Sequence, residues 1–189
     1  MRNRLFIISG PSGVGKGTLV KLLIEEDKTL ALSVSCTTRS PRTGETDGKD
    51  YFFISKEEFL SRMEQDGFLE SDEHFGNFYG TPKSFVAKTL CDRSVILEID
   101  VVGALNVRNK CKEEFDPVLI FIAAPDEKEL RARLAGRCSE DEESLKGRLL
   151  RADYENSLQS EYDYIVVNDD LQEAKARLQA IIHQEKNRE

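Results

Sequence analysis

The sequence predicts an α/β fold with a parallel sheet, because short apolar runs alternate along the chain with helical patterns. The runs that resemble buried strands span residues 4–9, 94–100, 117–124 and 163–167. Continuous apolar runs of this length are typical of parallel strands covered by helices on both faces. Between them, Leu19, Leu22 and Leu23 share one helical face, and residues 171–182 form another amphipathic helix. Right-handed crossovers between such strands give a three-layer core.

Two stretches interrupt this alternation. Residues 35–82 are polar and rich in turns, with short aromatic patches around one helix near residues 56–65, which indicates an inserted subdomain of small strands. Residues 126–160 are helical and strongly charged, and the segment GRCSEDEES predicts a loop between two helices. The predicted core comprises about residues 1–34, 83–125 and 161–189.

Composition excludes several classes of partner and site. The net charge of -8 argues against general affinity for nucleic acids, which depends on lysine and arginine. The four cysteines form no C-x-x-C pair, so neither a disulfide scaffold nor a zinc site is expected. The apolar runs are far shorter than the ~20 residues that span a bilayer, and the N-terminus lacks a secretory-signal pattern. We expect one compact cytoplasmic domain without a membrane partner; its oligomeric state is not indicated.

A glycine-rich segment joins the first strand-like run to the first helix. Gly10, Gly15 and Lys16 match the spacing G-x-x-x-x-G-K of a phosphate-binding loop. In such a loop, backbone N–H groups and the helix N-terminus surround phosphate oxygens, and the lysine reaches the terminal phosphates. The alternative is a glycine-rich turn without a ligand. The residues expected to bind nucleotide phosphates are Gly10, Pro11, Ser12, Gly13, Val14, Gly15, Lys16, Gly17 and Thr18.

The loop departs from the usual pattern at Gly17, where a serine or threonine is often a direct magnesium ligand. The run G-K-G-T resembles the loops of adenylate and guanylate kinases. In such kinases the two nucleotide substrates and water can hold the metal. This resemblance implies that Mg²⁺ is bound mainly through phosphates and water, and that Thr18 hydrogen-bonds a phosphate.

A second anion site is indicated in the turn-rich segment. Arg39 and Arg42 lie three residues apart, and Tyr51 follows them. Paired guanidinium groups match a phosphate geometrically, and a tyrosine hydroxyl can complete its shell. By spacing alone, arginines in a polar turn are explained equally well as solvated side chains.

The segment TTRSPRTGETDGKDYFF closely resembles the signature of guanylate kinases, and the resemblance extends over essentially the whole chain. It implies a P-loop kinase core, with a GMP-binding subdomain at 35–82 and a lid at 126–160. In that family, the GMP phosphate is bound by residues that correspond to Arg39, Arg42, Tyr51 and Tyr79. The residues at or near the guanine base correspond to Ser35, Glu70 and Thr81.

The hydrogen-bond donors of guanine explain why an acidic residue such as Glu70 suits this position. Guanine presents its N1–H and 2-amino groups side by side, so one carboxylate can accept from both. Adenine has an unprotonated N1 and would be repelled. A buried acceptor discriminates strongly because the wrong base leaves it unpaired. Without the family resemblance, Glu70 would be interpreted as an exposed strand glutamate.

The segment LRARLAGRCSEDEESLKGRLLRADYE resembles the family lid, whose arginines close over the ATP phosphates. Arg133 and Arg137 lie four residues apart and share a helical face. Cys138 stands where glycine is common in the family, and Arg131 and Arg151 are expected to be solvated. The residues expected to act in catalysis are Lys16, Arg133, Arg137 and Arg148.

Two further positions are assigned by the resemblance. Asp100 ends an apolar run in LEIDVVG, as in the acidic motif that supports magnesium in many nucleotide enzymes. The resemblance implies that it contacts GMP or supports Mg²⁺ indirectly, although Val102 replaces a frequent glutamine. Asn168 matches a position near the adenine of ATP.

The expected activity is that of a guanylate kinase, which converts ATP and GMP to ADP and GDP with Mg²⁺ and also accepts dGMP. Two alternatives remain open. Another nucleoside monophosphate kinase would share the loop and the lid, but would not explain Glu70 and Thr81. A non-catalytic module of the same fold would not need Lys16 or the lid arginines.

Overall fold

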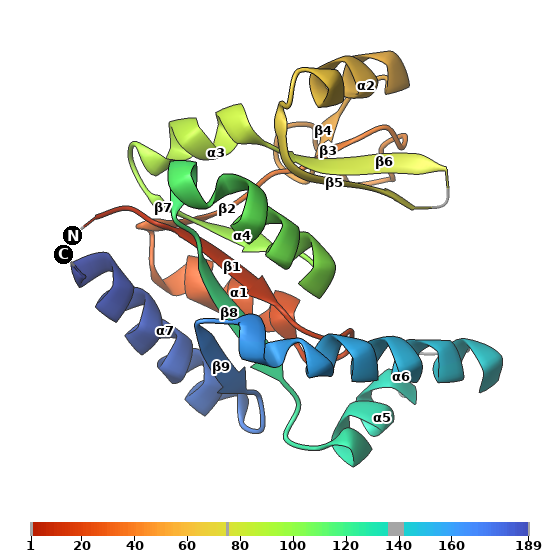
Figure 1. Cartoon of the computed structure of the whole chain (residues 1–189), viewed down its shortest axis with the longest axis vertical. Helices are drawn as coiled ribbons and strands as arrows, with labels where there is room; N and C mark the ends of the chain where they lie inside the picture. The colour runs from red at the N-terminus through yellow and green to blue at the C-terminus, as the bar shows by residue number, and fades with distance from the viewer. Residues whose placement is uncertain (1, 75, 136–141, 189) are drawn as a thin grey trace.

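The central sheet of the computed structural model, which describes residues 2–74, 76–135 and 142–188, is parallel. Its strand order is β2-β7-β1-β8-β9 (Figure 1). The strands are β1 (Leu5–Ser9), β2 (Leu30–Leu32), β7 (Ser94–Glu98), β8 (Val118–Ala123) and β9 (Tyr164–Val167). The α/β prediction is confirmed, and four strands lie within the predicted runs. The sequence missed β2, which has only three residues and lies at one edge of the sheet.

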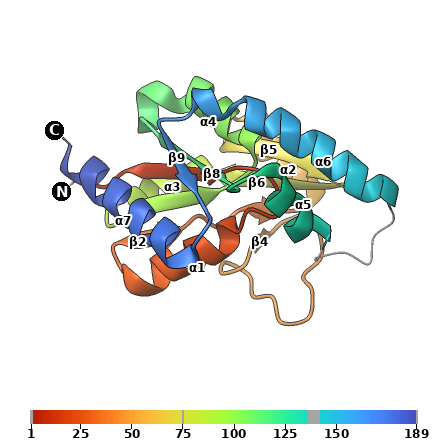
Figure 2. The ribbon, with the colours of Figure 1, turned by 90° about the horizontal axis from the view of Figure 1, so that it is seen from below.

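Helices cover both faces of this sheet, which is why β1 is apolar at every position before Ser9. Phe6 and Ile8 point into one buried cluster, whereas Leu5 and Ile7 point into another. Helices α1 and α7 contribute to the first cluster, and α3 and α4 contribute to the second. Figure 2 shows α1 and α4 on opposite sides of the strands. Their bounds are Lys16–Glu26 for α1, Lys83–Leu90 for α3, Val101–Phe115 for α4 and Leu171–Asn187 for α7.

A second, four-stranded sheet with the order β4-β3-β6-β5 lies at the top right of Figure 1. Its elements are β3 (Cys36–Thr37), β4 (Phe52–Phe53), α2 (Lys56–Glu64), β5 (Phe68–His74) and β6 (Asn77–Pro82). Its small core is aromatic, because the Phe59 ring stacks on Phe68 and Phe78 at centroid distances of 4.4 and 5.4 Å. The Ser55 side chain caps α2 by accepting a hydrogen bond from the Glu58 N–H.

The charged stretch after β8 forms two helices, as the sequence predicts. They are α5 (Glu127–Ala135) and α6 (Glu142–Ser157), followed by a short 3-10 helix, η1 (Gln159–Glu161). Leu130, Leu134 and Ala152 join these helices to the core cluster under α1. Arg137 and Cys138 lie outside the described residues.

The two chain ends lie side by side in Figures 1 and 2. The Arg2 N–H donates to the Lys186 carbonyl at 2.8 Å, and the Arg4 guanidinium binds the buried carboxylate of Glu185 at 2.7 Å. Within the described part of the chain, no helix combines the length and the apolar character needed to cross a membrane.

Candidate active site

The glycine-rich loop connects the carboxyl end of β1 to α1, which begins at Lys16. Gly10 has a φ of 140°, and a Cβ atom there would collide with the Ile122 carbonyl oxygen. Gly15 has a φ of 92°, and a Cβ atom there would lie 2.6 Å from the Asn168 side-chain nitrogen. Both positions therefore require glycine for steric reasons, before any ligand is considered. The loop places the N-terminus of α1 at its open side, where partial positive charge favours an anion.

The side chains around the loop hold its shape. The Lys16 ammonium donates to the carbonyls of Gly10 at 2.5 Å and Pro11 at 3.0 Å. The buried Asn168 amide donates to the Val14 carbonyl at 2.7 Å. In this structure the Asn168 side chain therefore braces the loop, while Thr18 lies exposed in the first turn of α1. Val14 is completely buried, and Ser12 is exposed.

Glu98 is an acidic residue beside the loop that sequence reasoning missed. It is the last residue of β7, and a Cβ atom on Gly17 would lie 3.4 Å from its carboxylate. Desolvation raises the pKa of Glu98, and the charge of Lys16 partly offsets this shift. Any side chain at position 17 would therefore touch the Glu98 carboxylate. The signal in the sequence was the end of the apolar run, which we placed two residues too late.

Asp100 does not end β7, as the sequence suggested, but caps α4. Its Oδ1 atom accepts a hydrogen bond from the Gly103 N–H at 2.7 Å. Its Oδ2 atom accepts one from the Arg151 guanidinium at 2.8 Å. Arg151 is exposed, as expected, but it is not without partners, because α6 carries its side chain onto Asp100 and Glu155. Arg131 is exposed, in line with expectation.

A cavity of about 410 Å³ lies at the loop, between the sheet and α6. It is lined by Gly10, Ser12, Lys16, Glu98, Ile99, Asp100, Arg148, Arg151 and Glu155. Arg133 on α5 is turned elsewhere, since it donates to Glu129 and to the Asn168 carbonyl. The cavity combines positive charge from lysine and arginine with three carboxylates, an arrangement that suits phosphates accompanied by a cation.

Whether a magnesium ion can bind in the loop cavity depends on the carboxylates that line it. The described residues contain no group of three or more His, Cys, Asp or Glu that could hold a metal alone. Mg²⁺ is usually bound through one or two carboxylates together with substrate phosphates and water. Glu98 and Asp100 line the loop cavity and meet that requirement.

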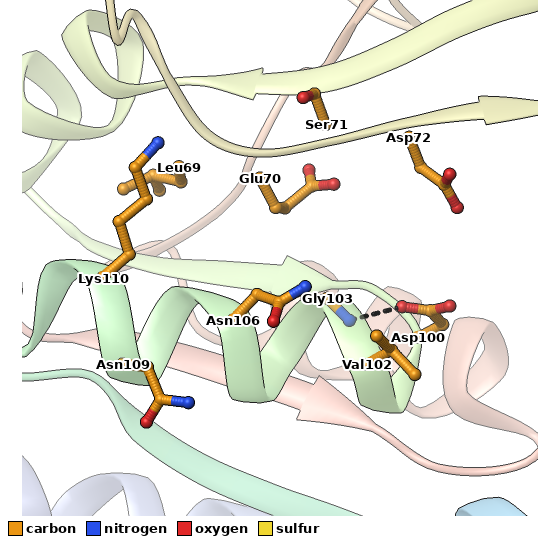
Figure 3. Close-up of a pocket in the computed structure, with 10 residues that line it drawn as sticks. All are labelled: Leu69, Glu70, Ser71, Asp72, Asp100, Val102, Gly103, Asn106, Asn109 and Lys110. Carbon is orange, nitrogen blue, oxygen red and sulfur yellow. Dashed lines mark hydrogen bonds between the residues drawn. The ribbon is translucent and has the colours of Figure 1, made fainter.

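A second cavity, of about 600 Å³, lies between β5 and α4 (Figure 3). It is lined by Leu69, Glu70, Ser71, Asp72, Asp100, Val102, Gly103, Asn106, Asn109 and Lys110. Asp100 therefore lines both cavities. The Glu70 carboxylate lies between the strand and the helix in Figure 3. Burial raises the pKa of Glu70, hydrogen bonds from Thr81 lower it, and the charges of Asp100 and Asp72 raise it further.

The structure brings together the three residues expected near the base. Thr81 donates from its N–H at 3.1 Å and from its hydroxyl at 2.7 Å, in both cases to Oε1 of Glu70. The Ser35 and Thr81 hydroxyls lie 3.3 Å apart. Because Thr81 is completely buried, it fixes the orientation of the carboxylate. The result is an oriented acceptor in a polar cavity.

Of the four residues expected to bind a phosphate, Arg39, Tyr51 and Tyr79 lie close together, whereas the Arg42 side chain is exposed. The Arg39 guanidinium lies 5.4 Å from the centre of the Tyr51 ring, and the Tyr51 and Tyr79 rings are 6.0 Å apart. Arg39 makes two 2.9 Å bonds to Glu45, which also accepts from the Arg42 N–H at 2.7 Å.

Glu45, which sequence reasoning missed, occupies a place where an anion fits. The bonds to Arg39 and Arg42 lower the pKa of its carboxyl to about 2. Among the described residues, the Arg39 Nε is the buried side-chain nitrogen without a hydrogen-bond partner. The arginine fork is thus already oriented toward an oxyanion and retains one unmet donor.

Comparisons with known proteins agree with this geometry. The guanylate kinase family model matches residues 2–185. A guanylate kinase of Caldanaerobacter subterraneus subsp. tengcongensis is 50% identical over 185 residues, covering 97% of this chain and 88% of the relative. One from Clostridium perfringens strain SM101 is 49% identical over 188 residues, covering 99% and 86%.

Solved structures give the same result. A crystal structure of guanylate kinase from Anaplasma phagocytophilum matches with a TM-score of 0.74 and 34% identity, covering 99% of this chain and 88% of that one. Shikimate kinase from Bacteroides thetaiotaomicron matches with a TM-score of 0.55 and 14% identity, covering 95% and 98%. The second likeness concerns the fold alone.

Proposed function

Because the chain belongs to the guanylate kinase family, we propose that it transfers the γ-phosphoryl group of ATP to GMP, and also to dGMP. The observation that carries this proposal is the Glu70 carboxylate, which Thr81 orients in a cavity next to the phosphate loop. Guanine donates from N1–H and from its 2-amino group, and this carboxylate offers it the matching acceptor.

The acceptor nucleotide spans the second sheet in this proposal. Ser35 and Thr81 complete the surroundings of the base, and Asp100 faces the same cavity. The GMP phosphate takes the place of the Glu45 carboxylate at Arg39. Its other ligands are Arg42, Tyr51 and Tyr79. The unmet Nε donor of Arg39 supports this assignment.

The donor nucleotide occupies the loop cavity. Backbone N–H groups of Gly10 and of residues 12–18 surround the phosphates, and Asn168 lies near the adenine. The Lys16 ammonium contacts the phosphoryl group that is transferred. Arg148, Arg133 and Arg137 supply positive charge from the lid. A bound Mg²⁺ would neutralise part of the phosphate charge, and Glu98 and Asp100 are the residues of the cavity that would hold it.

The chain contributes positioning and charge rather than covalent chemistry. We propose that residues 35–82 and 126–160 move as a GMP-binding subdomain and a lid over a core formed by the remaining residues. Closure of these two parts excludes water, which keeps ATP from being hydrolysed without an acceptor.

A coupled assay of ADP release tests the proposal. We expect turnover with ATP that depends on added GMP, is much slower with AMP and requires a divalent cation. Turnover that is equal or faster with AMP would contradict the role of Glu70. If neither nucleotide gives turnover although both bind, the protein is a non-catalytic module of the same fold.

A further inference from the structure

Asp100 occupies the wall between the two cavities. One carboxylate oxygen is fixed by the Gly103 N–H at the start of α4, as the dashed line in Figure 3 shows. The other oxygen binds Arg151, which belongs to α6 on the side of the loop cavity. The position of the carboxylate therefore depends on elements from both sides of the wall.

Arg151 is itself held in place. Its Nε atom donates to Glu155 at 3.0 Å, one helical turn along α6. Glu155 is only 4% exposed, whereas the Arg151 side chain is 56% exposed. An exposed ion pair is normally weak, partly because two long side chains must be ordered. Here the buried glutamate already orders the arginine, so the contact with Asp100 costs less entropy.

The charge of Arg151 matters because the acceptor cavity is acidic. Glu70, Asp72 and Asp100 all line it. Its lysine, Lys110, is paired with Asp66 and also donates to the Phe68 carbonyl. Arg151 thus offsets an acidic charge in a pocket that has to admit a nucleotide carrying an anionic phosphate.

We propose that Arg151 is a positioning residue: it holds the Asp100 carboxylate in place for the acceptor nucleotide and so couples α6 to the acceptor cavity. The inference rests on the proposed function, since it takes GMP as the acceptor. Its guanidinium is occupied by Asp100 and Glu155, so it is not assigned to the ATP phosphates. Loss of Arg151 weakens GMP binding in two ways, because Asp100 is released and the acidic charge of the cavity is left without compensation.

Equilibrium binding of GMP and of a non-hydrolysable ATP analogue tests the role of Arg151. We expect Arg151→Ala to raise the Kd for GMP about fivefold and the Kd for the ATP analogue less than twofold. Arg151→Lys should recover part of the loss. Arg131→Ala is the matched control, an exposed lid arginine whose removal should change neither constant.

A double-mutant cycle tests whether Arg151 acts through its contact with Asp100. In an Asp100→Asn background, Arg151→Ala should raise the Kd for GMP less than twofold, since the partner carboxylate is already neutral. An unchanged fivefold effect in that background would overturn the assignment to Asp100. A larger loss for the ATP analogue than for GMP would overturn it as well, because Arg151 would then be a phosphate ligand. If the wild-type protein itself does not bind GMP, the proposed function fails first and this inference with it.

Discussion

The phosphate loop and the acceptor cavity differ in what determines their shape. The loop is one short segment whose backbone conformation is set by glycines and braced by Asn168. The acceptor cavity collects side chains from β5, from α4 and from the turn before it. The loop therefore requires residues without a side chain at certain positions, whereas the cavity requires particular polar side chains. Substitutions in the loop should affect folding and turnover, whereas those in the cavity should affect the choice of nucleotide.

The largest effect is expected at Lys16. Lys16→Met removes the ammonium that is proposed to follow the transferred phosphoryl group, and we expect kcat to fall by ~10²–10³-fold. The Kd for GMP should change less than twofold, because Lys16 does not line the acceptor cavity. Steady-state kinetics and GMP titration measure the two quantities. Lys21→Met, on the exposed side of the same helix, is the control and should retain full turnover.

The steric origin of the loop can be tested at Gly10. Gly10→Ala adds a Cβ atom that collides with Ile122 at an unfavourable φ, so the free energy of unfolding should fall by about 3 kcal/mol. Gly44 is the matched control, since it has a φ of 93° but no atom within 4 Å of an added Cβ. Gly44→Ala should cost only about 1 kcal/mol, the conformational part. Equal losses in urea unfolding would mean that the collision is relieved by local movement.

A substitution in the acceptor cavity should change the specificity for the acceptor nucleotide. Glu70→Gln keeps an acceptor for Thr81 but replaces the second oxygen with a donor, so the KM for GMP should rise by ~10–100-fold while the KM for ATP stays constant. Because the folded state raises the pKa of Glu70, its protonated form favours folding. That contribution is present at low pH and is lost as the pH rises through the folded-state pKa, so the substitution should not destabilise the protein at neutral pH.

Glu73→Gln, an exposed change on the same strand, is the control for Glu70→Gln. It should leave both KM values unchanged. A comparable rise in the KM for GMP in this control would assign the effect to the net charge of β5 rather than to the Glu70 carboxylate.

The smallest expected effect is a shift in pH dependence. GMP recognition needs ionised Glu70, whose pKa lies above the ordinary value of 4.5. The kcat/KM for GMP should therefore decline as the pH falls through this raised pKa, earlier than for an ordinary glutamate. In Glu70→Gln this acidic limb should disappear. Persistence of the limb in the variant would assign it to another carboxylate, such as Glu98, whose pKa is also raised.

The same contrast explains what could be predicted from the sequence. The strands β1, β7, β8 and β9 and the phosphate loop were predictable because each is encoded within a short continuous segment. The residues of the acceptor cavity were named through family resemblance, since nothing in the spacing of Ser35, Glu70 and Thr81 predicts that they meet. Their meeting depends on the antiparallel pairing of β5 with β6 and of β3 with β6.

The roles of Glu98 and Arg151 at the site were not predicted from the sequence, for a different reason. Glu98 was passed over because the end of β7 is set by the start of α4, which Asp100 caps. The contact of Arg151 depends on the path of α6 over the loop cavity, and an amphipathic pattern does not indicate that path. In both cases the missing information is where one element stops or how it crosses another.

The adjacency of the chain ends has a practical consequence. Both cavities form beyond the carboxyl ends of β1 and β7, whereas Arg2 meets Lys186 near the opposite end of β1, before that strand begins. A short linker could therefore join the two termini, and new ends could be opened at Asp92, in the exposed turn between α3 and β7. A circularly permuted chain of this kind, or one attached to a surface through either terminus, would keep its nucleotide entrances facing solvent.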